Sequence, residues 1–251
     1  MTTFSLENRT ALVTGGSRGI GAAIVALFAE RGARVGYCHY DDHTNAEALS
    51  ARLAADGYAV SHTACDVSHA EDVDALALWA SGTLGHVDIL VNCAGIAGDV
   101  SFDDITIELF DRMIGVHLRG TFMVTKKFYP AMVARGWGRI INFSSQLAYK
   151  GAPDLSHYCA AKAGIVGFTR ALAYEAAPKG ITVNSIAPGP IETEMLRGLS
   201  DSWRAMKQAQ LPLGRFGTVD EIAPTVLLLA SEEGAYYVGQ TLSPNGGDVM
   251  I

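Results

Sequence analysis

The sequence predicts an α/β protein in which helices cover both faces of a parallel sheet. Short segments rich in Val and Ile alternate with longer helical patterns, and these segments are apolar on both of their faces. The predicted strands span 10–14, 34–39, 59–64, 87–92, 138–144, 181–187 and 241–243. Parallel strands joined by helices need right-handed crossovers, which place helices on both sides of the sheet. We therefore expect a single doubly wound domain over residues 1–251 that binds ligands beyond the carboxyl ends of its strands.

The composition fits a chain with a large buried core and no membrane segment. Of the 251 residues, 49% are hydrophobic and 18% are charged, and no apolar run reaches the roughly 20 residues of a membrane span. Because the first residues lack a signal-peptide pattern, we expect a cytoplasmic protein. The four cysteines are Cys38, Cys65, Cys93 and Cys159. None forms a C-x-x-C pair, so we expect reduced thiols and no disulfide framework.

The charge balance argues against polyanionic partners. The chain carries 19 basic and 26 acidic residues, for a net charge of −7, and no Lys/Arg cluster offsets this locally. A nucleic-acid backbone or an anionic membrane surface attracts proteins with the opposite pattern. We expect neither as a partner.

The first predicted strand runs directly into a glycine-rich turn, which is followed by an Ala-rich helix over 22–31. The turn reads Thr14-Gly15-Gly16-Ser17-Arg18-Gly19-Ile20-Gly21. Glycines let the chain turn sharply and let backbone N–H groups approach a pyrophosphate at the positive end of a helix. A tight strand–helix connection without a ligand would also explain the turn by itself, so the dinucleotide hypothesis needs further motifs.

Three such motifs follow in order along the chain. They are Asn92-Cys93-Ala94-Gly95, then Ser145 with Tyr158-x-x-x-Lys162, and then Pro188-Gly189-Pro190-Ile191-Glu192-Thr193. With the T-G-x-x-x-G-x-G spacing of the turn, they resemble the short-chain dehydrogenase/reductase family over 10–247, and its 3-oxoacyl-carrier-protein reductases in particular. The resemblance implies a Rossmann-type catalytic domain that transfers hydride between a nicotinamide cofactor and a carbonyl or alcohol carbon.

The resemblance also implies which residues hold the cofactor. Asp66 and Val67 would flank the adenine, although the residues alone favour Asp66 as a helix N-terminal residue. Ile191 and Thr193 would hold the nicotinamide carboxamide. The expected set comprises Gly15, Ser17, Arg18, Gly19, Ile20, Gly21, His39, Asp66, Val67, Asn92, Ala94, Gly95, Tyr158, Lys162, Pro188, Gly189, Ile191 and Thr193.

The end of the second predicted strand bears on the choice between NADP and NAD. An acidic residue there usually selects NAD because its carboxylate binds the ribose hydroxyls and repels a 2′-phosphate. This chain has His39 at that place, and Arg18 in the glycine turn suits a 2′-phosphate. Asp41 and Asp42 follow closely and could take the ribose if the strand ended later. We favour NADP, with NAD as the alternative.

Tyr158 and Lys162 form the expected proton-transfer pair. They are four positions apart in a predicted helix over 156–177, so their side chains lie one turn apart on the same face. A neighbouring ammonium favours a phenolate, so we expect Lys162 to lower the pKa of Tyr158. By the resemblance, Ser145 hydrogen-bonds the reacting oxygen.

One position departs from the family pattern. The family commonly carries an asparagine in the helix before the fifth strand, where it holds a water in a proton relay to the lysine; this chain has His117 there. An imidazole can donate or accept a hydrogen bond, so His117 could hold that water or titrate in the relay. The alternative is a packed helix residue. His39 and His43 lie near Cys38 without a second ligand cluster, so we expect no catalytic metal.

Substrate selection is expected in residues 146–153 and in a lid within 188–218. Tyr174 stands where carrier-protein reductases commonly have an arginine, and the chain is acidic, so an acyl carrier protein is a possible but not a favoured partner. We expect an NADPH-dependent ketoreductase for a small ketone or 3-oxoacyl thioester. The alternatives are an NAD-dependent sugar or hydroxy-acid dehydrogenase and a non-catalytic nicotinamide-binding regulator. The resemblance further implies a homotetramer in which helices over 108–135 and 156–177 pack across interfaces.

Overall fold

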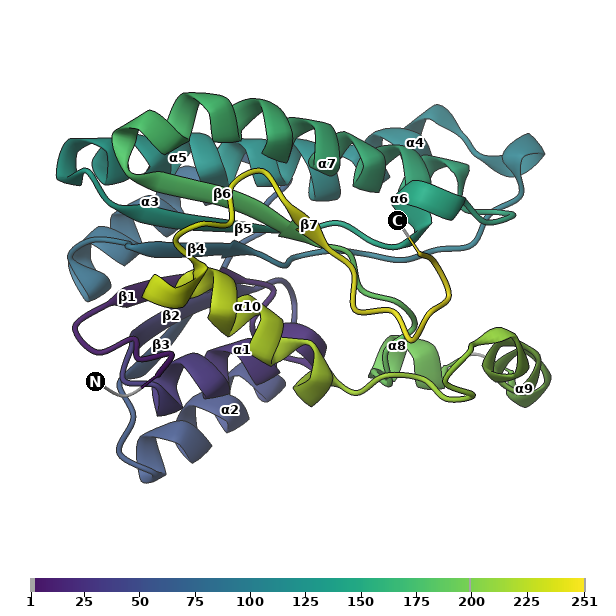
Figure 1. Cartoon of the computed structure of the whole chain (residues 1–251), viewed down its shortest axis with the longest axis horizontal. Helices are drawn as coiled ribbons and strands as arrows, with labels where there is room; N and C mark the ends of the chain where they lie inside the picture. The colour runs from purple at the N-terminus through teal and green to yellow at the C-terminus, as the bar shows by residue number, and fades with distance from the viewer. Residues whose placement is uncertain (1–2, 199, 251) are drawn as a thin grey trace.

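The protein is built on one sheet of seven parallel strands in the order β3-β2-β1-β4-β5-β6-β7 (Figure 1). The computed structural model describes residues 3–198 and 200–250. The strands are β1 Thr10–Thr14, β2 Arg34–His39, β3 Val60–Ala64, β4 Ile89–Asn92, β5 Gly138–Phe143, β6 Ile181–Ile186 and β7 Thr241–Leu242. Each lies within a predicted strand, so the predicted doubly wound α/β class is confirmed. The strand order reverses between β1 and β4, and such a switch point opens a ligand-binding crevice.

Helices cover both faces of this sheet (Figure 1). One face carries α1, α2 and α10, and the other carries α3, α5 and α7. The α-helices are α1 Gly19–Glu30, α2 His43–Ala55, α3 Ala70–Leu84, α4 Ile107–Ile114, α5 Gly120–Arg135, α6 Leu147–Lys150, α7 Ser156–Ala176, α8 Glu194–Arg197, α9 Asp201–Gln210 and α10 Ala223–Ala230. In the part of the chain that the structure describes, no helix is both long and apolar enough to cross a membrane.

Adjacent residues of the central strands supply two separate cores. Val13 and Val91 pack toward α1, α2 and α10, whereas Leu12 and Leu90 pack toward α3, α5 and α7. Because successive side chains of a strand point to opposite faces, a strand covered on both sides needs apolar residues at every position. Burial of each such side chain contributes about 1.5–3 kcal/mol. The two helical layers therefore fix the position of the strands, and with them the crevice.

The predicted helix over 108–135 is interrupted by a π-helical segment, Gly115–Arg119, between α4 and α5. The prediction of one regular helix is therefore wrong at its centre. A Cβ at Gly120 would lie 3.0 Å from a methyl carbon of Val67, so the glycine lets the widened turn pack against the loop after β3. π-helical turns are frequent at functional sites, and this one contains His117.

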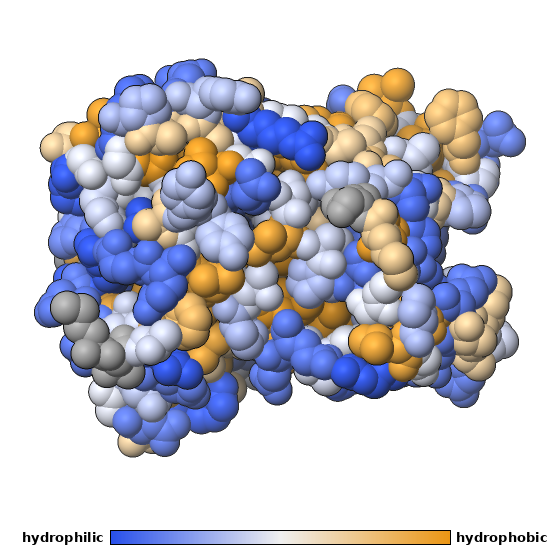
Figure 2. Space-filling model, in the orientation of Figure 1, coloured by the Kyte–Doolittle hydropathy of each residue, from blue (hydrophilic) through white to orange (hydrophobic). Residues whose placement is uncertain are grey.

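Residues of the 188–218 segment form α8 and α9, which stand beyond the carboxyl end of the sheet (Figure 1). Leu211 and Phe216 follow α9 and are buried, so they anchor the end of the segment. Figure 2 shows the surface hollowed between the part of the molecule that carries α4 and the part that carries α9. The segment predicted to be a lid therefore borders an opening at the carboxyl end of the strands.

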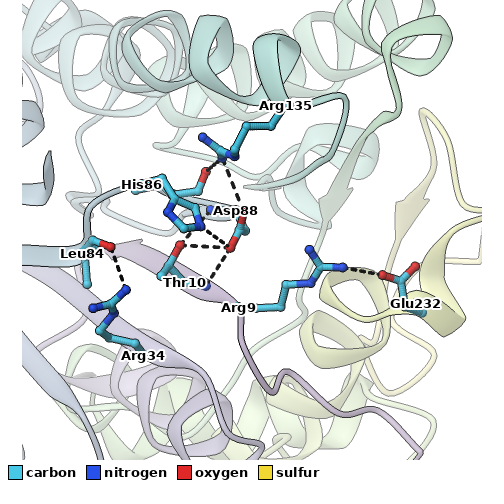
Figure 3. A network of polar contacts seen from close by, with 9 residues as sticks. Arg9, Thr10, Arg34, Leu84, His86, Asp88, Arg135 and Glu232 are labelled. Atoms are coloured by element: carbon cyan, nitrogen blue, oxygen red, sulfur yellow. Dashed lines mark hydrogen bonds and ion pairs between the residues drawn. The ribbon is translucent and has the colours of Figure 1, made fainter.

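The opposite end of the sheet is held by a buried carboxylate (Figure 3). Asp88 precedes β4, and its Oδ2 accepts hydrogen bonds from the backbone N–H of Thr10 at 3.0 Å and from the Thr10 hydroxyl at 3.1 Å. The His86 ring and the Arg135 guanidinium lie 3.2 Å and 3.5 Å from its oxygens. Asp88 thus connects the starts of β1 and β4 to the end of α5.

Replacing this carboxylate tests its structural role. Asp88→Ala leaves two buried donors of Thr10 without an acceptor, so we expect the free energy of unfolding to fall by about 1–3 kcal/mol. The matched control is Asp74→Ala, which removes an exposed ion pair with Lys127 and should cost less than about 1 kcal/mol. Urea denaturation of both variants measures the difference. Equal stability of the two variants would contradict the assignment.

Candidate active site

The loops after β1 and β4 are joined at the switch point of the sheet. The register pairs Thr14 with Asn92, and the Thr14 hydroxyl accepts hydrogen bonds from the backbone N–H groups of Cys93 and Ala94, both at 3.1 Å. Gly15 has φ +67°, and a Cβ there would lie 2.8 Å from Cα of Ala94. The glycine-rich turn and the Asn92–Gly95 motif therefore form one wall of the crevice.

The turn itself requires its glycines. Gly19 has φ +56°, a conformation that side chains disfavour, and a Cβ at Gly21 would lie 2.1 Å from the carbonyl oxygen of Gly15. α1 begins at Gly19 without an acidic residue in its first turn, and its N-cap Arg18 makes no side-chain capping bond. Among the described residues, the first N–H groups of α1 are thus left uncapped at the positive end of the helix dipole. This arrangement fits a pyrophosphate.

The 188–193 loop closes over the same turn. The methyl carbon of Thr193 would lie 3.4 Å from a Cβ on Gly19. The loop is held from behind, because the N–H of Gln146 donates to the carbonyl oxygen of Pro188 at 3.1 Å and the N–H of Glu192 donates to that of Gly217 at 2.8 Å. Gly189 packs so closely that its Cβ would meet Cα of Asn245 at 2.6 Å. The loop expected to hold the nicotinamide therefore faces the turn expected to hold the phosphates.

The adenine-side residue Asp66 is engaged by neighbours that the sequence did not reveal. Its Oδ1 accepts hydrogen bonds from the N–H and hydroxyl of Ser68, and its Oδ2 accepts one from Arg112 at 2.9 Å. Burial alone would raise the pKa of Asp66, but these bonds outweigh it and hold the pKa below its usual range. Asp66 precedes the N-cap of α3, His69, and its backbone N–H donates to Asp72 in the first turn of that helix at 2.9 Å.

A hollow of about 570 Å³ lies beside Asp66 at the ends of β2 and β3. Its lining residues are Tyr40, Asp41, His43, Ala64, Cys65, Asp66, Asp72 and Ala75. Arg112 also lies over the Tyr40 ring, 5.6 Å from its centroid. An aromatic ring, a carboxylate and a guanidinium thus surround the place where the resemblance puts the adenosine.

His39 does not face this hollow. Its side chain is buried, and its ring lies 4.7 Å from that of His43 and 5.4 Å from that of His62. Burial, followed by the charges of the two neighbouring imidazoles, lowers the pKa of His39, so the ring is neutral at pH 7. The expected contact of His39 with the ribose therefore does not suit its position. Asp42 instead approaches the turn, where its Oδ2 accepts a hydrogen bond from Ser17 at 2.6 Å and lies 3.9 Å from Nε of Arg18.

The amide of Asn92 is bound within the scaffold. Its amide donates hydrogen bonds to Thr125 and to Asn142, both at 2.9 Å. The amide of Asn142 in turn donates to Thr169 at 2.9 Å. This buried polar chain connects β4 and β5 to α5 and α7, so the Asn92 side chain braces the scaffold.

Tyr158 and Lys162 lie on α7, next to the carboxyl end of β5. Lys162 Nζ donates to the carbonyl oxygen of Phe143 at 2.8 Å and lies 5.6 Å from the centroid of the Tyr158 ring. Burial raises the pKa of Tyr158 to about 12, with a hydrogen bond from Ser145 acting in the opposite direction. Burial lowers the pKa of Lys162 to about 8. Desolvation of the phenolate therefore outweighs the effect of the neighbouring ammonium, so the pKa of Tyr158 is raised and not lowered as expected.

His117 packs directly against the Tyr158 ring. The two rings meet edge to face with centroids 5.3 Å apart, and Nε2 of His117 lies 2.8 Å from the carbonyl oxygen of Ile96. A Cβ at Gly95 would lie 2.6 Å from Cε1 of His117, so the imidazole needs the glycine opposite it. Burial, and then the charge of Lys162, lowers the pKa of His117 well below its usual range. A neutral imidazole thus links the loop after β4 to the tyrosine.

The described side chains around this site do not form the ligand sets that bind metal ions in proteins. Within residues 3–198 and 200–250, no group of three or more His, Cys, Asp and Glu side chains is arranged to hold a metal ion.

Two contacts at the site could not be predicted from the sequence. Arg112 binds Asp66, and Gln146 Nε2 donates a hydrogen bond to Asp248 Oδ2. The partners in these two contacts are 46 and 102 positions apart, so no short-range spacing could reveal them.

Comparison with known proteins assigns this arrangement to a family. Residues 15–248 match the family described as Enoyl-(Acyl carrier protein) reductase. The chain is 42% identical over 247 residues to the 3-oxoacyl-[acyl-carrier-protein] reductase FabG of Vibrio cholerae, covering 98% of this chain and 100% of that relative. It is 40% identical over 243 residues to the acetoacetyl-CoA reductase of Allochromatium vinosum, covering 96% and 99%.

Solved structures of dehydrogenases resemble this chain over nearly its whole length. A putative gluconate dehydrogenase from Agrobacterium tumefaciens matches with a TM-score of 0.95 and 31% identity over 100% of both chains. A Serratia marcescens short-chain dehydrogenase/reductase mutant matches with a TM-score of 0.90 and 33% identity over 97% of this chain and 98% of that one. The chain therefore belongs to the short-chain dehydrogenase/reductase family, whose members are nicotinamide-dependent oxidoreductases acting on carbonyl and alcohol groups.

Proposed function

We propose that this chain is an NADPH-dependent ketoreductase that reduces a 3-oxoacyl thioester or another small ketone. The observation that carries the proposal is that Ser145, Tyr158 and Lys162 meet beside the crevice formed by the glycine-rich turn and the 188–193 loop. Two relatives of nearly full-length similarity are named for reduction of 3-oxoacyl and acetoacetyl groups. An NAD-dependent sugar-acid dehydrogenase is the second candidate, because the putative gluconate dehydrogenase shares the fold over its whole length.

The protonation state of Tyr158 suits its task as the proton donor in a reduction. With a pKa of about 12, the phenol holds its proton at neutral pH and is ready to act as a general acid. The reverse reaction needs a phenolate, which burial disfavours. The surroundings of Tyr158 therefore suit a proton donor better than a base.

Each residue has a defined task in this proposal. The nicotinamide, when bound, supplies the hydride. Tyr158 donates its hydroxyl proton to the carbonyl oxygen, and the Ser145 hydroxyl donates a hydrogen bond to that same oxygen. The Lys162 ammonium stabilises the phenolate that proton donation leaves behind, because opposite charges attract strongly in a buried site. His117 holds the Tyr158 ring and the loop after β4, and its Nδ1, which has no partner among the described residues, is available to the proton relay.

The cofactor preference rests on Arg18. Its side chain is 63% exposed on the glycine-rich turn and can reach a 2′-phosphate. The position of Asp42 favours NAD instead, because a carboxylate next to Ser17 would repel that phosphate. We give Arg18 more weight and favour NADP, since the Asp42 carboxylate already accepts hydrogen bonds from Ser17 and Asn45.

We further propose a cytoplasmic homotetramer, which the exposed aromatic residues of α5 and α7 support. Phe122 and Tyr174 are 49% and 86% exposed, and Phe122 stacks edge to face on Phe168 across the two helices. All four cysteines are free, which suits a reducing compartment. Light scattering of the purified chain tests the assembly, and a stable monomer at micromolar concentration would reject it.

Removing the proton donor tests the mechanism. Tyr158→Phe keeps the ring against His117 but removes the acid, so we expect kcat to fall by about 10²–10⁴-fold while the Kd for NADPH stays within about twofold. Tyr236→Phe, which removes the hydroxyl of a fully exposed tyrosine away from the site, is the matched control and should retain full turnover. A Tyr158→Phe variant with normal turnover would remove Tyr158 from the mechanism.

Steady-state kinetics with both cofactors test the function and the role of Arg18. We expect turnover of acetoacetyl thioesters or small ketones with NADPH at a higher kcat/KM than with NADH. Arg18→Gln should raise the KM for NADPH by about tenfold, because a charge-assisted hydrogen bond is lost, and should leave the KM for NADH unchanged. Arg31→Gln, at the far end of α1, serves as control. A preference for NADH that Arg18→Gln does not alter would assign the ribose to Asp42.

A further inference from the structure

A buried carboxylate near the C-terminus joins the lid to the catalytic loop. Asp248 has a side chain only 6% exposed, and its Oδ1 accepts a hydrogen bond from Lys150 at 2.8 Å. Its Oδ2 accepts hydrogen bonds from Lys207 at 2.6 Å and from Gln146 Nε2 at 2.5 Å. Lys207 lies on α9, whereas Gln146 and Lys150 lie in the segment that directly follows Ser145. Both oxygens of the carboxylate are thus used to connect two separate parts of the site.

The carboxylate is presented by a rigid turn. Asn245 Oδ1 accepts a hydrogen bond from the N–H of Gly247 at 2.9 Å, and Asn245 Nδ2 donates to the carbonyl oxygen of Val249 at 2.7 Å. Gly246 and Gly247 have φ +68° and +87°, and a Cβ on Gly247 would lie 2.9 Å from the Pro212 ring. The turn therefore packs against the chain just after α9. In Figure 1 the yellow segment after β7 runs toward α6, in agreement with the Lys150 contact.

The ion pair between Lys207 and Asp248 connects α9 to a part of the protein outside the 188–218 segment. In the described ranges, the other side-chain contacts of α9 stay within the 188–218 segment: Arg204 binds Glu192 and the carbonyl oxygen of Leu196, and Trp203 stacks on Phe216. Lys207 alone crosses to the C-terminal turn. Loss of that ion pair would remove this side-chain tether of α9 and leave the internal contacts of the segment in place.

Charge explains why a carboxylate is needed at this position. The ammonium groups of Lys150 and Lys207 converge on one side chain, and they would repel each other without it. The Asp248 carboxylate therefore brings together two like charges, one from each side of the opening, and its removal turns an attraction between α9 and the 146–150 segment into a repulsion.

We propose that Asp248 is a positioning residue that latches α9 over the substrate site and holds Gln146 in place next to Ser145. The side chains that bind Asp248 lie in the loop after β5 and in the lid, so we expect its loss to act mainly on substrate binding, although the turn that carries Asp248 also packs against Gly189. Among the described residues, the side-chain hydrogen bonds of Asp248 go to Gln146, Lys150 and Lys207, and none goes to the glycine-rich turn that we expect to bind the cofactor phosphates. The inference rests on the proposed function for its kinetic consequence, while the closure of α9 is independent of turnover.

The kinetic test compares Asp248→Asn, Lys207→Met and the double variant with the parent chain. We expect each single variant to raise the substrate KM by about tenfold, with kcat and the Kd for NADPH within about twofold. The double variant should be no worse than the worse single variant, because both changes break the same contact. Asp248→Glu should restore most of the affinity. Lys179→Met, an exposed lysine near the end of α7, is the matched control.

A second readout needs no activity. Trypsin cleavage after Arg204, which lies in α9, reports the opening of this helix, and we expect Asp248→Asn to be cut at least fivefold faster there than the parent chain or Lys179→Met. Faster cleavage supports the latch even if no tested substrate turns over, which separates its failure from failure of the proposed function. Unchanged cleavage, or additive effects of Asp248→Asn and Lys207→Met on KM, would overturn the latch. If Asp248→Asn does not fold, Lys207→Met carries both measurements, because it leaves the cleavage site after Arg204 in place.

Discussion

The hydroxyl of Thr14 is the contact on which the geometry of the site depends. By accepting hydrogen bonds from Cys93 and Ala94, it joins the loops after β1 and β4 at the point where the strand order reverses. Each wall of the crevice is then placed by close packing: the turn packs on Ala94, and His117 packs on Gly95. A parallel sheet covered on both faces makes this possible, because its strand ends cannot shift without disturbing two cores.

Burial is the second constraint, and it sets the chemistry. Lys162 and His117 are buried and Tyr158 is half-buried beside them, and this loss of water raises the pKa of the phenol and lowers the pKa values of the ammonium and the imidazole. A protonated phenol beside a lysine that is still charged at pH 7 matches a group that gives up a proton as hydride arrives. The same desolvation strengthens the attraction between Lys162 and a nascent phenolate.

Local pattern predicted most of the fold, and long-range packing supplied what the pattern could not. The strands, the glycine-rich turn and the one-turn separation of Tyr158 and Lys162 all follow from short-range periodicity and spacing. The burial of His39 against His62, the salt bridge between Asp66 and Arg112 and the contacts of Asp248 join residues far apart in sequence. The expected direction of the Tyr158 pKa shift was wrong for the same reason. The spacing of Tyr158 and Lys162 reveals a neighbouring charge, but it does not reveal how much water the phenol loses on folding.

The central claim is that Tyr158 is a protonated acid at neutral pH, and ultraviolet difference titration tests it directly. Phenolate absorbs near 295 nm, so subtracting the pH titration of Tyr158→Phe from that of the parent chain isolates this one tyrosine among nine. With a pKa of about 12, the difference signal should be absent at pH 7 and should still be absent at pH 10, the usual pKa of tyrosine. A phenolate signal that appears between pH 6 and 8 would contradict the account and assign Tyr158 the role of a base.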